Sequence, residues 1–257
     1  MAAALQALYR YPIKGFTGEA LGAVAVQPGV GVAGDRKIAV TTGATPFDPA
    51  SPEPWPKASF LTVMRYPALV RVRAAYDFDH NRLSAALPGA AVQHYDLGDD
   101  AARRRFGREL KAFLDLPDGW RPEVVAADGR RFTDASVEGP RLMESLSLIN
   151  LATLADIARQ AGRPLDHRRF RGNLYIDGLE PWAEFGWVDR TFRIGGVGFR
   201  GLLKTPRCAA IEADPDTGAT DAGLLKLLRA TYGHHHCGIQ IEAVDAGTVA
   251  VGAPVAG

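Results

Sequence analysis

The chain has 257 residues, a length that fits one large domain or two modest ones. Hydrophobic residues make up 47% and charged residues 23% of it, which excludes a disordered or collagen-like chain. The 30 basic and 29 acidic residues give a net charge of +1. This balance argues against a dedicated nucleic-acid binder or a protein that binds anionic membranes, since both are normally far more basic.

Sequence signals of export or membrane insertion are absent. No apolar run reaches the roughly 20 residues that a membrane helix needs, and the first eight residues lack the basic and apolar regions of a signal peptide. The two cysteines, Cys208 and Cys237, are too few for a disulfide scaffold. We therefore expect a cytoplasmic protein with no membrane partner and no nucleic-acid partner.

The first half of the chain is dominated by predicted strands, which cover residues 5–13, 21–27, 36–41, 60–63, 69–76 and 82–87. Turn residues at 77–81 indicate a hairpin between the last two strands. A helix is predicted over 101–114, because its apolar residues fall on one face. The polar, turn-rich stretch 115–134 indicates a domain boundary, which we place between residues 128 and 129 to give domains 1–128 and 129–257.

The second half combines two helices with more short strands. Asn150 is expected to cap a helix that runs to Ala161 and ends at Gly162, and Asp221 to cap another that runs through Tyr232. Strands are predicted over 169–176, 191–194, 198–203, 209–212, 238–244 and 248–251. Many short strands with few helices are typical of a closed or nearly closed β-barrel.

A glycine-rich segment, Gly29–Gly34, matches the dinucleotide-binding pattern G-x-G-x-x-G. That pattern binds a pyrophosphate only where a helix follows, because the helix N-terminus meets the phosphates. Here a strand is expected next, and Pro28 precedes the first glycine. The segment is therefore interpreted as a turn between strands.

Cys208 follows Lys204 and Arg207, and nearby cations favour the thiolate form that serves as a nucleophile or a metal ligand. A lone cysteine is, however, more often a small buried apolar residue. The Asp214–Gly218 segment reads as a tight turn.

The segment 167–176 places Arg169, Arg171, Asn173 and Tyr175 on one face if it forms a strand. Two guanidinium groups and an amide on one face suit an oxyanion such as a phosphate. The alternative is a solvated basic face. Lys14, which leaves a predicted strand after Pro12, is a further candidate for an anion contact.

His234, His235, His236 and Cys237 carry the residue types that bind zinc. Adjacent residues of a strand point to alternate faces, so at most two could share a site. A polar loop that enters a strand is the favoured interpretation of this run.

Taken together and in this order, several segments resemble the MOSC family, the molybdenum cofactor sulfurase C-terminal-like domains. The similarity is closest to two-part members with a MOSC-associated N-terminal β-barrel, including the amidoxime-reducing component group. The matching segments are Tyr11–Lys14, Gly34–Arg36, Asp134–Ser136, Phe170–Asn173, Arg207–Cys208, Asp214–Gly218, Cys237–Ile239 and Gly247–Gly252.

This resemblance implies a β-dominated α+β fold, in which a smaller N-terminal β-barrel-like domain precedes a MOSC-type closed β-barrel with a few peripheral helices. It implies the molybdenum cofactor in its molybdopterin form, with Cys208 as the catalytic metal ligand. The residues it assigns to cofactor binding are Lys14, Arg36, Arg171 and Asn173, with Asp134, Ser136 and Arg207 at the edge. The thiolate, the basic residues and the amide of Asn173 suit an anionic, sulfur-rich cofactor.

The function that follows is a molybdenum-dependent oxidoreductase that reduces N-hydroxylated or similarly N- or S-oxygenated small molecules. Since the chain has no cysteine pattern for an iron–sulfur cluster, the electrons would come from a separate electron-transfer protein.

Two other functions remain open. One is a non-catalytic carrier of the cofactor or of sulfur, held as a persulfide on Cys208; the other is a Cys–His hydrolase that uses Cys208 with one of His234–His236. The chain departs from the family pattern at Gly15, Met64, Ala135 and Pro206.

Overall fold

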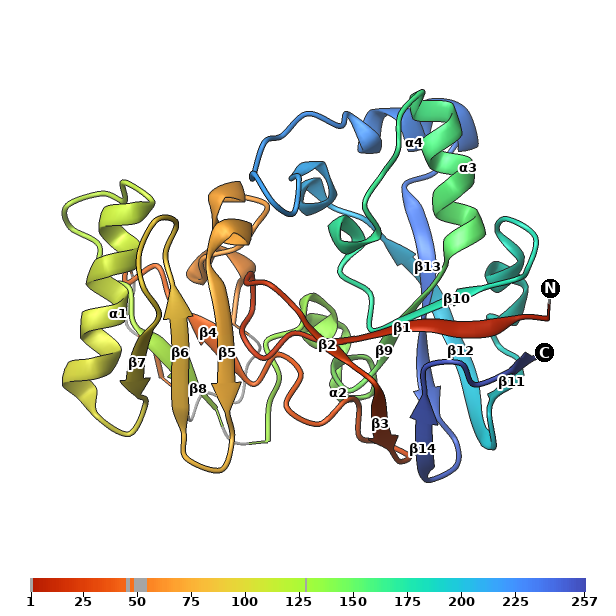
Figure 1. The fold of residues 1–257 in the computed structure, drawn as a ribbon, viewed down its shortest axis with the longest axis horizontal. Helices are drawn as coiled ribbons and strands as arrows, with labels where there is room; N and C mark the ends of the chain where they lie inside the picture. Colours follow the sequence, from red (N-terminus) through yellow and green to blue (C-terminus); the bar gives the residue numbers. More distant parts are fainter. Residues whose placement is uncertain (1, 45–46, 49–54, 128) are drawn as a thin grey trace.

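The computed structural model describes residues 2–44, 47–48, 55–127 and 129–257. It is mostly β-structure with few helices, in two lobes that lie side by side (Figure 1). The larger lobe contains an eight-stranded sheet of order β15-β11-β12-β13-β9-β10-β1-β2. Its strands are β1 (Ala4–Arg10), β2 (Glu19–Leu21), β9 (Leu146–Asn150), β10 (Leu174–Asp177), β11 (Thr191–Ile194), β12 (Val197–Pro206), β13 (His236–Ala243) and β15 (Val255–Ala256).

The large sheet is open, so the expectation of a closed barrel is wrong. The two ends of the strand order, β15 and β2, form no ladder with each other. The chain around β15 meets the start of β1 through an isolated bridge between Ala4 and Pro254 and through backbone hydrogen bonds, such as the one from Val255 to the carbonyl of Ala3 at 2.8 Å. The physical reason for the missing ladder is the length of β15, which has only two residues and uses them in its ladder with β11. The other edge of β1 is instead shared with β2.

The smaller lobe holds a three-stranded sheet, a two-stranded ladder and one long helix. Its strands are β4 (Ile38–Val40), β5 (Arg73–Asp77), β6 (Arg82–Ala86), β7 (Gln93–Asp96) and β8 (Val124–Ala126), and its helix is α1 (Asp100–Phe113). Asp99 caps α1 by accepting a hydrogen bond from the amide of Ala101 at 2.8 Å. The apolar face of α1, through Phe106 and Leu110, packs into the core of this lobe.

The first strands of the chain belong physically to the large lobe. β1 pairs with β10, and β3 (Ala23–Val26) pairs with β14 (Gly247–Ala250) near the C-terminus. The N- and C-terminal ends consequently lie close together (Figure 1). The division into 1–128 and 129–257 stays a prediction, and strands are exchanged across it.

Three helices complete the large lobe, namely α2 (Pro140–Met143), α3 (Leu151–Ala161) and α4 (Leu224–Tyr232). The prediction of α3 is confirmed at both ends, since Asn150 accepts from the amide of Ala152 and Gly162 adopts the left-handed conformation. The prediction that Asp221 caps α4 is wrong. Glu212 caps it instead, with both carboxylate oxygens accepting from the first two amides of the helix at 2.8 and 2.9 Å.

Some predicted strands are not strands. Residues 209–212 form a 3-10 turn, 60–63 contain only an isolated bridge at Phe60, and 69–71 belong to a 3-10 turn before β5. Of the predicted strand 169–176, only the part from Leu174 onward is β10. The segment after the glycine pattern is β4, with no helix between them, as expected. No helix among the described residues is long and apolar enough to cross a membrane.

Candidate functional site

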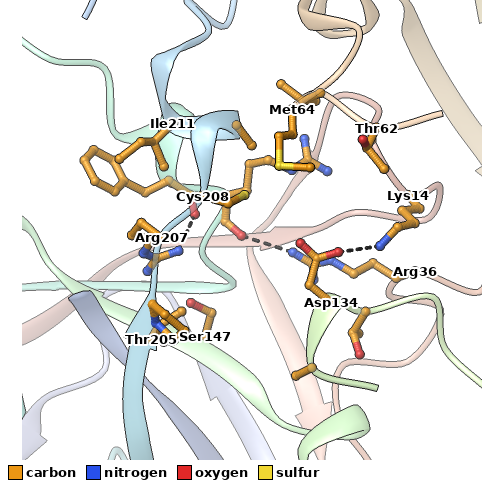
Figure 2. A pocket seen from close by; sticks show the side chains of 18 of the residues that line it. Lys14, Arg36, Thr62, Met64, Asp134, Ser147, Thr205, Arg207, Cys208 and Ile211 are labelled. Carbon is orange, nitrogen blue, oxygen red and sulfur yellow. Dashed lines mark hydrogen bonds and ion pairs between the residues drawn. The ribbon is translucent and has the colours of Figure 1, made fainter. Parts of the chain in front are cut away.

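An open cleft lies where the two lobes meet, with about 930 Å³ of empty space including its mouth. Figure 2 shows side chains from both halves of the chain pointing into it. Seven of the eight predicted site residues line this cleft: Lys14, Arg36, Asp134, Arg171, Asn173, Arg207 and Cys208. Side chains up to 194 positions apart in the chain, those of Lys14 and Cys208, thus line one cleft.

The eighth predicted residue, Ser136, does not line the cleft. Its hydroxyl donates to the carbonyl of Thr133 at 2.8 Å, within a 3-10 turn that spans Asp134–Glu138. Ser136 instead lines a neighbouring cavity that shares Asp134 with the cleft.

Cys208 is half-buried and stands directly after β12, at the start of the 3-10 turn Ala209–Glu212. The preceding residue, Arg207, anchors the backbone next to Cys208 through its side chain. The Arg207 guanidinium donates to the carbonyl of Cys237 at 2.8 Å and to the carbonyl of Phe170 at 2.9 Å. Arg207 therefore positions the thiol by tying the end of β12 to β13 and to Phe170.

A row of alternating charges leads from Lys14 through Asp134 and Lys57 to Cys208; Figure 2 shows its first pair, Lys14 and Asp134. The buried Lys14 ammonium donates to the Asp134 carboxylate at 2.6 Å and to the carbonyl of Phe132 at 2.9 Å. The other Asp134 oxygen forms an ion pair with Lys57. The Lys57 ammonium also donates to the Cys208 sulfur at 3.7 Å.

Burial and neighbouring charges shift the pKa values of Lys14, Asp134 and Lys57. Burial lowers the pKa of Lys14, and the adjacent carboxylate of Asp134 opposes that change. Burial alone would raise the pKa of Asp134, but Lys14 and Lys57 together outweigh it and hold that pKa far below its usual range. Burial also opposes the charge on Lys57, yet Asp134 and the Cys208 sulfur raise its pKa overall. These shifts favour the charged forms of Asp134 and Lys57 beside the thiol.

Arg36 and Arg171 form a second positive wall. Both have positive φ angles, of 52° each, a conformation that costs a non-glycine residue energy. Their guanidinium groups stack over the ring of Tyr11, at 4.8 and 4.5 Å from its centroid. Arg36 is paired with Asp35, whereas Arg171 donates to the carbonyl of Phe16 at 2.7 Å.

Of the predicted strand 169–176, the part that contains Arg169, Arg171 and Asn173 is not a strand. Arg169 lies in a 3-10 turn, and the backbone of Arg171 adopts the left-handed conformation. The three side chains nevertheless line the same cleft. Asn173 is used within the sheet. Its side-chain oxygen accepts from the amide of Ser147 at 3.1 Å, and its amide group donates to the carbonyl of Tyr9 at 3.2 Å.

Three of the residues that line the cleft each have a buried polar atom with no hydrogen-bond partner in the part of the chain that the structure describes: Thr62 Oγ1, Ser147 Oγ and Arg169 Nε. Buried polar groups are nearly always paired in folded proteins, so these atoms mark where a polar ligand would be held. Sequence reasoning missed Ser147, Lys57 and the role of Thr62. Thr62 stands in a segment noted only as a departure from the family pattern.

Gly15, another such departure, has a structural reason. Its φ angle is +83°, and a Cβ atom there would lie 2.9 Å from the carbonyl oxygen of Leu61. A side chain at this position would be strained and would push Lys14 out of place.

The histidine run lies outside the cleft. His234 packs among aromatic rings, with centroids 5.6 Å from Trp182 and 5.7 Å from Phe185. Cys237 is fully buried in the core. Among the described residues, no group of three or more His, Cys, Asp or Glu side chains is placed to hold a metal ion.

Comparisons with known proteins identify the two domains of the chain. The model of the MOSC N-terminal beta barrel domain matches residues 2–112, and that of the MOSC domain matches residues 134–256. One similar curated protein is mitochondrial amidoxime-reducing component 1 of Mus musculus, which is 25% identical over a stretch that covers 54% of this chain and 41% of that protein. Another is mitochondrial amidoxime reducing component 2 of Rattus norvegicus, which is 33% identical over a stretch that covers 30% of this chain and 22% of that protein.

These matched stretches span less than half of either relative. Among solved structures, the YUAD protein of Bacillus subtilis covers 99% of this chain and 94% of its own, with 12% identity and a TM-score of 0.44. The two domain models follow each other along the chain and include every residue predicted for the site. The chain therefore belongs to the MOSC family, with an N-terminal MOSC barrel domain ahead of its MOSC domain.

Proposed function

We propose that this protein binds a molybdenum cofactor in its molybdopterin form and uses it to reduce N-hydroxylated or similarly N- or S-oxygenated small molecules. The observation that carries the proposal is the placement of the Cys208 thiol beside a cation, at the mouth of a cleft whose buried polar atoms lack partners. Membership of the MOSC family and the relatives named for amidoxime reduction support it.

The donor set of the cleft fits such a cofactor. Thiolate sulfur is a reasonable ligand for a soft metal centre, and Cys208 presents it at the cleft. Arg36 and Arg171 supply positive charge for a phosphate. The hydroxyl groups of Thr62 and Ser147, which lack partners among the described residues, can donate to the phosphate or to the pterin ring.

Each part of the chain then has a defined task. Arg207 holds Cys208 in position through backbone carbonyls, and Asp134 keeps Lys14 and Lys57 at fixed places despite their like charges. When bound, the cofactor would supply two-electron redox chemistry with transfer of an oxygen atom. The protein binds it and orients it.

The electrons are proposed to come from a separate electron-transfer protein, because the sequence holds no cysteine pattern for an iron–sulfur centre. The substrate is proposed to be a small molecule that enters the cleft next to Cys208.

Metal content measured by mass spectrometry tests the proposal, on protein produced in a host that makes molybdopterin. We expect near-stoichiometric molybdenum in the wild type and in Cys237→Ala, and its loss in Cys208→Ala. The Cys237 control carries the same substitution at a buried position outside the cleft. Wild-type protein without molybdenum would refute cofactor binding.

Turnover separates an enzyme from a carrier. We expect the loaded wild type to reduce an amidoxime with a chemical electron donor, and Cys208→Ala to be inactive. Stoichiometric molybdenum that passes to an acceptor protein without any turnover would instead show the cofactor-carrier function.

A further inference from the structure

The turn Asp214–Gly218 has no task in the function described so far, yet it touches the smaller lobe. A Cβ atom at Gly218 would lie 3.0 Å from the carbonyl oxygen of Pro67 and 3.1 Å from the Cα atom of Ala68. The φ angle of Gly218 is +73°, so both the contact and the backbone conformation disfavour a side chain at this position. The turn of the large lobe therefore lies directly against the backbone of the smaller lobe.

On the side of the smaller lobe, this contact leads to a wall of the cleft. The segment Thr62–Met64 lines the cleft (Figure 2), and the 3-10 turn Pro67–Arg71 begins shortly after it. The amide of Tyr66 donates to the carbonyl of Thr62 at 2.8 Å, and the amide of Leu69 donates to the carbonyl of Tyr66 at 3.0 Å. Because these hydrogen bonds join the 3-10 turn to the wall, a shift of the turn also moves the wall.

On the side of the large lobe, the turn is anchored by Arg169. The Arg169 guanidinium donates to the Asp214 carboxylate at 3.0 Å and to the carbonyl of Glu212 at 2.9 Å. The other carboxylate oxygen of Asp214 accepts from the amides of Asp216 and Thr217, at 3.1 and 2.9 Å. One aspartate thus closes the turn and ties it to the large lobe.

Arg169 also connects this anchor to the cleft. Its side chain is buried and lines the cleft, and its Nε atom has no hydrogen-bond partner in the described part of the chain. A ligand that accepts a hydrogen bond from Nε is held by the side chain that fixes the turn. Apolar contacts close the remaining gap between the lobes, where Val63 and Val70 pack against Ala213 and Ala210.

We propose that Arg169, Asp214 and Gly218 are positioning residues that set the width of the cleft. They hold the Thr62–Met64 wall at a fixed distance from Cys208, and the missing side chain of Gly218 lets the two lobes come close enough for both to contact one ligand. The inference rests on the proposed function for the identity of that ligand. It adds the residues that keep the two walls together.

Gly218→Ala tests the contact between the lobes, and Gly223→Ala is the matched control. Gly223 also has a positive φ angle, of +59°, but a Cβ atom there would have open space around it. Both substitutions place an alanine in the left-handed region, so we expect both variants to unfold at a lower urea concentration, by a similar amount. Only Gly218→Ala pushes the two lobes apart.

The alkylation rate of Cys208 measures the cleft in protein from a host without molybdopterin. Labelling of Cys237 does not interfere, because that residue is fully buried. We expect iodoacetamide to react with Cys208 about threefold faster or more in Gly218→Ala, since a wider cleft exposes the thiol more often. Gly223→Ala should react at the wild-type rate. Equal rates in all three proteins, or an equal acceleration in both variants, would overturn the proposal.

A second pair of variants tests the anchor at Arg169. Asp214→Asn keeps a side-chain oxygen to close the turn but replaces the carboxylate that pairs with Arg169. Asp216→Asn is the matched control within the same turn, where the side chain is 68% exposed. We expect faster alkylation of Cys208 in Asp214→Asn and the wild-type rate in Asp216→Asn. A wild-type rate in Asp214→Asn would show that Arg169 does not position the turn.

Molybdenum retention during dialysis distinguishes this inference from the proposed function. We expect loaded Gly218→Ala to lose molybdenum faster than loaded Gly223→Ala, although both have similar stability. Equal retention in the two variants would overturn the role of the turn in holding the cofactor. If the wild type carries no molybdenum, the proposed function fails, whereas the alkylation rates of the cofactor-free proteins still confirm or refute the positioning of the cleft walls.

Discussion

Removing the hydroxyl of Thr62, which has no hydrogen-bond partner among the described residues, should stabilise the protein without cofactor and weaken cofactor retention in the loaded protein. Thr62 is 5% exposed and its Oγ1 atom has no partner. Leaving a buried polar group unpaired costs about 1–3 kcal/mol. Thr62→Val removes the hydroxyl at nearly the same volume. We therefore expect it to stabilise the empty protein by about 1 kcal/mol, at the lower end of that range because the cleft admits water.

The loaded protein should respond in the other direction. A hydrogen bond to a charged group contributes about 1.5–3 kcal/mol, so its loss should weaken cofactor retention by about tenfold or more. Thr153→Val is the matched control, because Thr153 is fully buried but its hydroxyl is paired. It donates to the Glu184 carboxylate at 3.0 Å and accepts from the amide of Trp182 at 2.8 Å. We expect this variant to lose about 2 kcal/mol of stability.

Urea unfolding of protein from a host without molybdopterin measures the first effect, and molybdenum content after extended dialysis of loaded protein measures the second. In a chain of this size 1 kcal/mol corresponds to about 2–4 °C in Tm. If Thr62→Val destabilised the empty protein as much as Thr153→Val does, the hydroxyl of Thr62 would have a partner within the fold. If it left cofactor retention unchanged, Thr62 would not contact the cofactor.

Three further predictions concern thiols, capping and acid stability. One equivalent of an alkylating reagent should label native protein at Cys208 only, since Cys237 is fully buried and burial raises the pKa of its thiol to about 12; mass spectrometry of the digested protein would show any second label. Glu212→Ala should cost about 1–2 kcal/mol by urea unfolding, and more than Asp221→Ala, because Glu212 caps α4. Asp134→Asn should cost about 1 kcal/mol at pH 7, a value kept low because its side chain is 53% exposed. The pKa of Asp134 is lower in the folded protein than in the unfolded chain, so its carboxylate contributes its full folding stability above about pH 4. This contribution disappears as the pH falls further. The unfolding curves of Asp134→Asn and the wild type should therefore converge in acid.

Local signals in the sequence were sufficient for α1, α3 and α4, whereas the four-residue helix α2 was not predicted. α3 was predicted at both ends because its two limits depend on neighbouring residues, the side chain of Asn150 and the left-handed Gly162. The cap of α4 could not be found in this way. Glu212 lies 12 positions before Leu224, and only the folded loop brings its carboxylate to the start of the helix.

Strand predictions failed where tertiary structure overrides pattern. β9 was missed because all five of its residues are buried, and a strand buried on both faces shows no alternation of polar and apolar residues. The predicted strand 169–176 failed in its first half because Arg171 adopts a left-handed conformation. Its residues still reach the cleft, since the turn and the strand lie on the same side of it.

The candidate site was predicted as far as its residues stand in short motifs. Lys14, Asp134 and Cys208 were found because each occurs in a segment that resembles the family. Lys57 was not, because it follows a proline-rich segment with no motif, and its partner Cys208 lies 151 positions further along the chain. Ser147 escaped attention because a lone serine in an apolar run carries no signal until its hydroxyl is seen to lack a partner.

The backbone at Arg36 and Arg171 indicates what the site is built to hold. Each residue keeps a positive φ angle, which costs about 1–2 kcal/mol for a side chain of this kind. Both costs serve one arrangement, in which two guanidinium groups meet on the buried ring of Tyr11 beside the cleft. Arg36 is already paired with Asp35, whereas Arg171 donates to the neutral carbonyl of Phe16. The strain and the charge of Arg171 are thus offset best when a phosphate or a similar anion occupies the cleft.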